Sequence, residues 1–164
     1  FAVAGNETLR NGLPGGLIAL LQHPQALADL RADPSLLPGA VEEMLRWWTP
    51  VMHFRRTAVQ DTELSGVEIK AGDKVVVWFS SANRDERAFT EPSKFDVGRR
   101  EADHLSFGHG PHFCLGAQLA RTQMRAIFEA VLDLSGTIQL DGHVDRLRSN
   151  FQNGVKHLPV RVPK

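Results

Sequence analysis

The first third of the chain carries apolar residues at the three- and four-residue spacing of amphipathic helices. Its opening segment, residues 1–13, is typical of a helix interior, and the two glycines after Pro14 predict on local rules that this helix ends there. Two further helices are predicted, over QHPQALADLRADP (22–34) and LLPGAVEEMLRWW (36–48). The first 48 residues are therefore expected to be helical.

The pattern then changes to one typical of β-strands, which predicts a small antiparallel sheet. Its strands are expected over FRRTAVQ (54–60), TELSGVEIK (62–70) and DKVVVWF (73–79). Further short strands are expected in TIQL (137–140), RLRSNF (146–151) and VKHLPVRV (155–162).

Between these regions, residues 80–113 show little periodicity beyond one helical turn in ANRDERAF (82–89). A loop of this length is expected to be functional or to be held in place by other parts of the molecule. It leads into LGAQLARTQMRAIFEAVLDL (115–134), whose amphipathic pattern predicts a helix of about five turns.

The composition of the chain argues against nucleic-acid binding, a disulfide-bonded fold and a membrane-spanning protein. Lysine plus arginine total 19 and aspartate plus glutamate total 19, so no net charge attracts a phosphate backbone, and nucleic acid is not expected as a partner. The single cysteine rules out an internal disulfide framework, which is consistent with a cytoplasmic location. No apolar stretch approaches the roughly 20 residues that a membrane span requires.

The chain begins without an initiator methionine and without the layout of a signal peptide. Its first residues are already typical of a helix interior. We therefore expect residues 1–164 to be one partial domain, incomplete at its N-terminus, from a longer protein.

The only cysteine, Cys114, lies where a glycine-rich loop meets the predicted helix 115–134. Unpaired backbone N–H groups and the positive end of the helix dipole favour a thiolate at such a position. The neighbouring glycines let the backbone pass close to a flat, bulky group, and two phenylalanines are placed to shield the sulfur. One sulfur cannot hold an iron–sulfur cluster, but it can be the sole protein ligand of a porphyrin iron.

Two other interpretations of this loop stay open on the residues alone. A single cysteine in a globular protein is most often a buried, inert side chain. A zinc site is the second alternative, in which His104, His109 and His112 join Cys114, although their spacing matches no tight cage.

The string FGHGPHFCLG (107–116) resembles the haem-binding signature F-x-x-G-x-x-x-C-x-G of the cytochrome P-450 family of haem-thiolate monooxygenases. Three further motifs of the family occur in the expected order, so the resemblance covers nearly the whole chain. It implies a mainly α fold with small antiparallel β-sheets (α+β), the C-terminal half of the cytochrome P-450 fold, truncated within its long central helix. It implies heme b (iron protoporphyrin IX) as cofactor, with Cys114 as the iron ligand. The cofactor-binding residues that it implies are Arg56, Phe107, Gly108, His112, Cys114 and Gly116.

A second motif pairs an acid and a base one helical turn apart. On spacing alone, Glu43 and Arg46 in EEMLR form a surface pair worth less than about 1 kcal/mol. In the family such a pair joins an arginine of the loop before the cysteine, and Arg99 matches that place. The resemblance therefore implies a buried, bidentate network with a structural role.

The string AGNET places small and then polar residues in an otherwise apolar helix, which by itself indicates a bend or a solvent-facing patch. In the family this stretch crosses the oxygen side of the haem. The resemblance makes Glu7 and Thr8 the catalytic acid and alcohol that relay protons to oxygen, and Ala4 a residue that leaves room for it. It also implies that the helix continues to about His23, with a kink at Pro14.

The resemblance also assigns a haem rim and a substrate pocket. Arg56 and His112 match positions that contact the haem propionates, and His104 is a weaker candidate for the same rim. The pocket residues that it implies are Ala4, Val51, Met52, Phe54, Phe151 and Val155. Because most of them are apolar, they favour a hydrophobic substrate.

The resemblance implies a monooxygenase that inserts one oxygen atom from O2 into a C–H bond of a sterol, a terpenoid, or a fatty or branched lipid. Electrons are expected from a ferredoxin-type donor with an NAD(P)H-dependent reductase, and Arg121 and Arg125 are candidates for its docking surface. Two alternatives stay open. One is a peroxide-driven peroxygenase, against which the retained Glu7 and Thr8 argue, and the other is a non-catalytic fragment that cannot hold haem alone.

Overall fold

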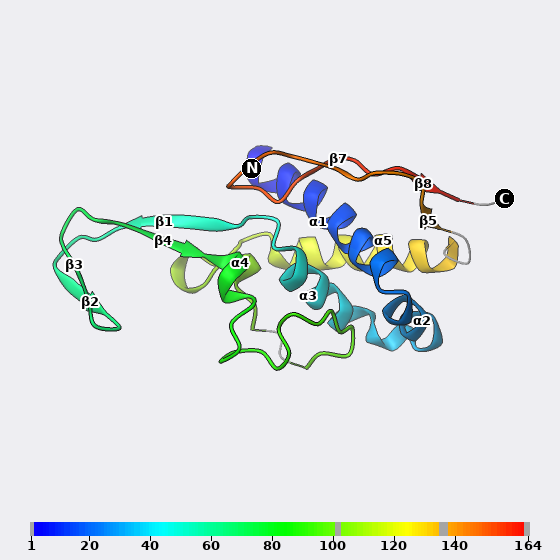
Figure 1. The fold of residues 1–164 in the computed structure, drawn as a ribbon, viewed down its shortest axis with the longest axis horizontal. Coiled ribbons are helices and arrows are strands. Elements are labelled where there is room, and N and C mark those ends of the chain that lie inside the picture. The colour runs from blue at the N-terminus through cyan, green and yellow to red at the C-terminus, as the bar shows by residue number, and fades with distance from the viewer. Residues whose placement is uncertain (1, 101–102, 135–137, 163–164) are drawn as a thin grey trace.

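The chain folds into helices and short strands, and the computed structural model describes residues 2–100, 103–134 and 138–162 (Figure 1). The α-helices are α1 (Ala2–Gln22), α2 (Pro24–Ala32), α3 (Leu37–Trp48), α4 (Phe79–Ala82) and α5 (Ala117–Leu134). The strands are β1 (His53–Thr57), β2 (Thr62–Leu64), β3 (Val67–Ile69), β4 (Lys74–Trp78), β5 (Gln139–Leu140), β6 (Asp145–Arg146), β7 (Val155–His157) and β8 (Val160–Arg161). Three short 3-10 helices are η1 (Pro34–Leu36), η2 (Leu105–Phe107) and η3 (Gly110–His112).

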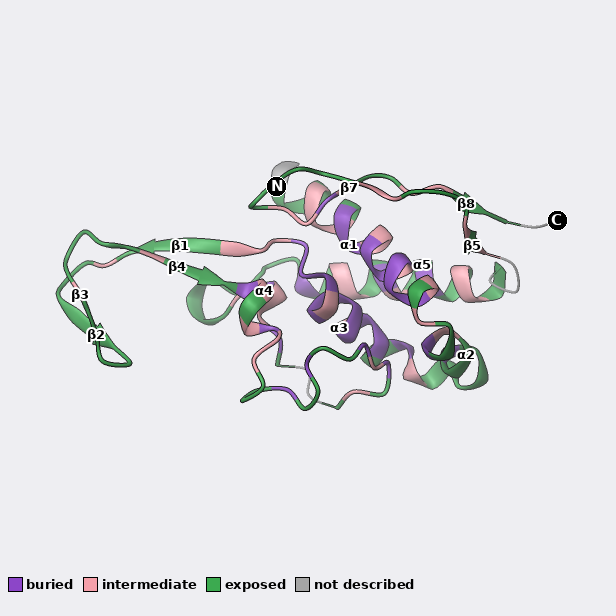
Figure 2. Ribbon diagram, in the orientation of Figure 1, coloured by how far each residue is buried: buried purple, intermediate pink, exposed green. Residues whose placement is uncertain are grey.

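The hydrophobic core lies where α3 packs between α1 and α5. Leu20 of α1, Met44 of α3 and Phe128 of α5 are almost completely buried. Figure 2 shows most of the buried residues, in purple, on α1 and α3. The predicted helices 22–34 and 36–48 are confirmed as α2 and α3, and the predicted helix 115–134 is confirmed as α5.

Helix α1 continues through Pro14 to Gln22. The local prediction that the helix ends at this proline is wrong, and the expectation that it continues is confirmed. A proline inside a helix costs one backbone hydrogen bond, but the glycines that follow allow close packing. A Cβ on Gly15 would overlap the Trp48 indole ring of α3, and one on Gly16 would lie 2.8 Å from the Phe128 ring of α5.

Strands β1 and β4 pair antiparallel, with Phe54 opposite Val77. Beyond them, β2 and β3 form a separate hairpin that turns at Ser65 and Gly66, both with positive φ. These two small sheets form an arm that extends away from the helices and is largely exposed (Figures 1 and 2). The predicted strands are confirmed, although β1 ends at Thr57 and does not reach residue 60.

Residues 80–100 and 103–113, the parts of the expected long loop that the structure describes, are largely irregular. The loop begins in the short helix α4, and the residues after Asn83 form turns, so the helical turn expected in 82–89 is displaced to α4. The loop runs past α3 and reaches α5 by way of η2 and η3 (Figure 1).

The chain after α5 runs back along α1 (Figure 1). Strand β5 pairs with β8 and β6 pairs with β7. The strand predicted over 146–151 is wrong for most of its length, because β6 ends at Arg146. Asn153 N–H instead donates to the Pro50 carbonyl oxygen at 2.9 Å, and Trp48 Nε1 donates to the Asn153 carbonyl oxygen at 2.7 Å.

The prediction of a mainly helical fold with small antiparallel sheets is confirmed. None of the helices that the structure describes is long and apolar enough to cross a membrane.

The contact between α1 and α3 predicts an asymmetry between two helical glycines. Gly15→Ala places a methyl group against the Trp48 ring, so we expect a loss of about 1–3 kcal/mol in the free energy of unfolding. Gly5→Ala is the matched control, because its Cβ meets no atom within 4 Å and the better helix former raises stability by up to about 1 kcal/mol. Urea unfolding measures both variants, and equal effects would contradict the tight packing at Gly15.

Candidate functional site

Cys114 lies in the loop between η3 and α5, just before the helix begins. Its backbone N–H donates a hydrogen bond to the Phe107 carbonyl oxygen at 2.9 Å, and its carbonyl oxygen accepts one from Ala117 N–H at 3.3 Å. Its side chain is exposed. The exposure does not fit a buried, inert cysteine.

Glycines give this loop its shape. Gly108 and Gly110 have φ angles of 72° and 71°, in the left-handed region that other residues rarely adopt. A Cβ on Gly110 would meet no atom within 4 Å, so the backbone angle, not crowding, requires a glycine there. A Cβ on Gly116 would lie 3.9 Å from Cys114 Sγ, so glycine at this position leaves space beside the sulfur.

Apolar side chains close to the thiol in sequence face solvent. Phe113 is 50% exposed, Leu115 90% and Leu119 63%. A soft ligand among exposed apolar side chains fits a haem, whose ring is flat and largely apolar and whose iron accepts an axial thiolate. The zinc alternative lacks support, because in the described part of the chain no three His, Cys, Asp or Glu side chains are grouped to hold a metal ion.

Glu43 and Arg46 of α3 lie together with Arg99 of the long loop. Arg46 Nε and Nη2 donate to the two carboxylate oxygens of Glu43 at 2.6 and 2.8 Å, and Arg99 Nε donates to Glu43 Oε2 at 3.1 Å. The Glu43 and Arg46 side chains are each 1% exposed. The geometry is therefore a buried, bidentate ion pair with a second arginine, not a solvated surface pair.

The two arginines of this network also hold loop carbonyl groups. Arg46 Nη1 donates to the carbonyl oxygens of Asn83 at 2.6 Å and Pro92 at 3.0 Å. Arg99 Nη1 donates to the Thr90 carbonyl oxygen at 2.6 Å, and Arg99 Nη2 to that of Lys94 at 3.0 Å. The network therefore replaces the regular hydrogen bonding that an irregular loop lacks.

Asn83 is a further structural residue that the sequence pattern does not single out. It is fully buried, its Nδ2 donates to Thr49 Oγ1 and to Ser106 Oγ at 2.9 Å, and its Oδ1 accepts from Leu105 N–H at 2.7 Å. These bonds join α3 to the segment just before the cysteine loop. The only signal in the sequence is an amide side chain at the start of a loop that needs internal hydrogen bonds.

Glu7 and Thr8 are half-buried near the N-terminal end of α1. The Glu7 carboxylate accepts a hydrogen bond from Arg10 Nη1 at 3.3 Å. Ala4 and Gly5, just before them, are exposed, and a Cβ on Gly5 would meet no atom within 4 Å. This end of α1 therefore carries an open surface of small residues next to an acid and an alcohol.

The predicted pocket segments, 51–54 and 151–155, lie against each other. Met52 N–H donates to the Phe151 carbonyl oxygen at 2.9 Å. The rings of Phe54 and Phe151 meet edge to face with their centroids 5.8 Å apart.

The same segments also reach α1. Val51 forms an isolated β-bridge with Gln152, and Val155 N–H donates to Asn11 Oδ1 of α1 at 3.4 Å. Ala4 lies on this helix as well, nearer its N-terminus. The structure therefore places the predicted pocket residues on three elements that touch one another.

His53 belongs to this cluster although the sequence pattern does not single it out. Its ring lies 4.4 Å from Trp78 and 5.7 Å from Phe151. Its Nδ1 atom is buried and has no hydrogen-bond partner among the described residues.

The predicted haem-rim residues are found on different elements. Arg56 is exposed on β1, with its Nη1 donating to the Arg55 carbonyl oxygen at 3.1 Å, and His112 is exposed in η3. His104 differs from them, because it is buried and its Nε2 lies 3.2 Å from Glu42 Oε2. It therefore faces the interior and not an open rim.

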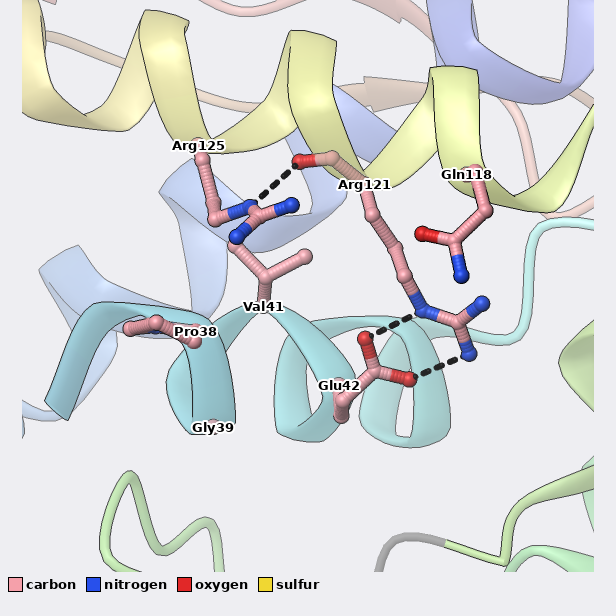
Figure 3. Close-up of a pocket in the computed structure, with 7 residues that line it drawn as sticks. All are labelled: Pro38, Gly39, Val41, Glu42, Gln118, Arg121 and Arg125. Carbon is pink, nitrogen blue, oxygen red and sulfur yellow. Dashed lines mark hydrogen bonds and ion pairs between the residues drawn. The ribbon is translucent and has the colours of Figure 1, made fainter.

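Glu42 links α3 to α5 beside a surface pocket (Figure 3). Arg121 Nε and Nη2 donate to its two carboxylate oxygens at 2.7 and 2.8 Å. Burial by itself raises the pKa of Glu42, but the interactions with the nearby His104 and Arg121 side chains outweigh it and lower the pKa from 4.5 to about 2. Arg121 is thus a paired cation, whereas the guanidinium of Arg125 extends into the pocket.

Comparisons with known proteins agree with these features. A family model described as Cytochrome P450 matches residues 28–134. The chain is 45% identical over 163 residues to linalool 8-monooxygenase of Pseudomonas putida, covering 99% of this chain and 40% of that protein. It is 46% identical over 160 residues to methyl-branched lipid omega-hydroxylase of Mycobacterium bovis, covering 96% of this chain and 37% of that protein. The chain thus spans about two fifths of the length of these relatives.

A solved structure shows the same arrangement. The fold matches that of a Bacillus megaterium enzyme crystallised in complex with testosterone, with a TM-score of 0.95 and 34% sequence identity. The match covers 98% of this chain and 45% of that chain.

The buried network predicts a large cost for removing one charge. Arg46→Met leaves the Glu43 carboxylate buried and frees loop carbonyl oxygens, so we expect a loss of about 3–5 kcal/mol in the free energy of unfolding. Arg161→Gln is the matched control, because its pair with Asp141 is exposed and worth less than about 1 kcal/mol. Chemical denaturation compares the two, and a small loss for Arg46→Met would show that the loop does not depend on the network.

Proposed function

Because this chain belongs to the cytochrome P450 family, we propose that it supplies the haem-binding part of a monooxygenase that inserts one oxygen atom from O2 into a C–H bond. The observation that carries the proposal is the exposed Cys114 thiol at the start of α5, in a loop shaped by glycines. That geometry presents one sulfur atom with open space beside it, which is what a cysteine that holds a haem iron would need.

Membership of this family implies a haem, and the residues present fit heme b. When bound, a haem with a thiolate ligand supplies the activation of dioxygen. Cys114 would hold the iron, and the glycine at position 116 would leave room beside the sulfur for the cofactor. Arg56 and His112 are exposed and would donate hydrogen bonds to the haem propionates.

Glu7 and Thr8 would deliver protons in the reaction. The Thr8 hydroxyl would donate a hydrogen bond to the bound oxygen, and the Glu7 carboxyl group would relay protons between solvent and this hydroxyl. The proposal is supported by their half-burial and by the small residues beside them, which leave α1 open there. Arg10 orients the Glu7 carboxylate through its hydrogen bond at 3.3 Å.

The substrate is a hydrophobic small molecule. Ala4, Val51, Met52 and Phe54 line its pocket, together with Phe151 and Val155 from the C-terminal tail, and most of these side chains are apolar. The relatives named above act on linalool and on methyl-branched lipids. A terpenoid, a sterol or a fatty or branched lipid is therefore the substrate class that we propose.

Electrons come from a separate ferredoxin-type protein that an NAD(P)H-dependent reductase supplies. The donor docks on the surface around the α3–α5 pocket, where Arg125 supplies a positive charge. The charge of Arg121 is already balanced by Glu42 (Figure 3). Such a surface favours an acidic partner and an association rate that falls with salt.

Thiolate ligation is tested by the absorption spectrum of the haem-loaded protein after reduction and exposure to carbon monoxide. We expect a strongly red-shifted Soret band in the wild type and its loss in Cys114→Ala, because that substitution removes the sulfur ligand. Phe113→Ala is the control, because it changes a side chain next to the cysteine and keeps the sulfur. Survival of the band in Cys114→Ala would refute the proposed function.

Proton delivery is tested at Thr8. Thr8→Val removes the hydroxyl but keeps the branched shape, so we expect several-fold more hydrogen peroxide per electron consumed, in line with the loss of a general acid–base group. Thr8→Ser keeps a hydroxyl and is expected to stay near the wild-type coupling. Peroxide release and electron-donor consumption are measured together, and equal coupling in the two variants would exclude the relay role.

A further inference from the structure

Glu42 is a junction between three parts of the molecule. It lies on α3, its carboxylate accepts two hydrogen bonds from Arg121 of α5, and its Oε2 lies 3.2 Å from Nε2 of the buried His104 in the long loop. His104 Nδ1 accepts a hydrogen bond from Ser106 N–H at 3.2 Å, and its buried Nε2, which faces Glu42, makes no hydrogen bond within the described part of the chain. One carboxylate therefore holds a side chain from α5 and one from the loop that precedes Cys114.

Both partners of Glu42 contact the same aromatic ring. The Arg121 guanidinium lies over the Phe107 ring, 4.6 Å from its centroid, and the His104 ring lies 5.7 Å from it. The Phe107 carbonyl oxygen in turn accepts the hydrogen bond of Cys114 N–H at 2.9 Å. A continuous series of contacts therefore runs from Glu42 to the backbone of Cys114.

The charges of the pair are only partly screened by water. The side chains of Arg121 and Glu42 are 24% and 17% exposed. The pKa of Arg121 is raised by its hydrogen bond with Glu42 and, to a smaller extent, by the negative charge of Cys114. The geometry agrees with this direction, because the Arg121 guanidinium lies over the Phe107 ring and the Phe107 carbonyl oxygen accepts the hydrogen bond of Cys114 N–H.

We propose that Glu42 is a positioning residue that holds Arg121 against Phe107 and balances its charge beside Cys114, and that this balance sets the reduction potential of the bound iron. The inference rests on the proposed function. A positive charge near the thiolate weakens its electron donation to iron and stabilises the additional electron of the ferrous state. Removing Glu42 leaves that charge uncompensated, whereas removing Arg121 leaves an excess of negative charge.

The test compares substitutions that break the same ion pair but change the charge in opposite directions. Glu42→Gln is expected to raise the ferrous-to-ferric ratio at a fixed ambient potential on the order of fivefold, and Arg121→Gln to lower it by a similar factor. The double variant Glu42→Gln/Arg121→Gln is neutral and is expected to return close to the wild type. Loss of packing alone would move both single variants in the same direction.

Two further variants separate charge from structure. Arg121→Lys keeps the positive charge but loses the two-point contact with Glu42, so we expect its potential to stay near that of the wild type. Asp141→Asn breaks an exposed pair with Arg161 in the tail and is expected to leave the potential unchanged. If Glu42→Gln fails to hold haem, the reduction potentials of Arg121→Gln and Arg121→Lys still show whether the positive charge at position 121 affects the iron.

Spectroelectrochemical titration of the haem-loaded protein, with a reduced carbon monoxide spectrum for each variant, gives the result. Opposite shifts in the single variants, with a thiolate-type spectrum in each, support the inference. Shifts in one direction, or no shift, with that spectrum retained would overturn this inference alone. A wild-type spectrum without thiolate ligation would overturn both this inference and the proposed function.

Discussion

The almost completely buried guanidinium group of Arg46 constrains the rest of the structure. A buried charge is tolerated only when it is paired and its remaining donors are satisfied. Glu43 supplies the paired carboxylate, and the carbonyl oxygens of Asn83, Pro92 and Lys94 accept further hydrogen bonds. The long loop therefore returns to α3, because its carbonyl oxygens accept hydrogen bonds that the buried Arg46 of α3 needs.

The position of the cysteine follows from the same helix. Glu43 and its neighbour Glu42 point to different partners, the first to the long loop and the second to Arg121 of α5. Ser106 adds a third link, because its Oγ donates to the Leu45 carbonyl oxygen at 2.7 Å. Helix α3 thus fixes both ends of the segment that presents Cys114, and a thiol that has to meet one iron atom gains a rigid frame.

Local sequence rules predicted the helices and strands well where the spacing of apolar residues or a turn residue decided the secondary structure. Helices α2, α3 and α5 follow from apolar spacing, and the β2–β3 hairpin follows from the turn at Gly66. The rules failed at Pro14, where packing of the following glycines against α3 and α5 outweighs the cost of a proline in a helix. They failed again after Arg146, because the chain there bonds to residues 48–52 and not to a neighbouring strand.

The sequence by itself determined which chemical groups are available. It places the single cysteine at a helix start and glycines in the loop before it, where two of them adopt positive φ. It also sets the three-residue spacing between Glu43 and Arg46. Only the tertiary structure decided which charged side chains form ion pairs and how deeply those pairs are buried. It buries Glu43 and Arg46 under the loop, and it turns His104 inward to share Glu42 with Arg121. The physical reason is that the strength of an ion pair depends on burial and distance, which residues far apart in the sequence set together.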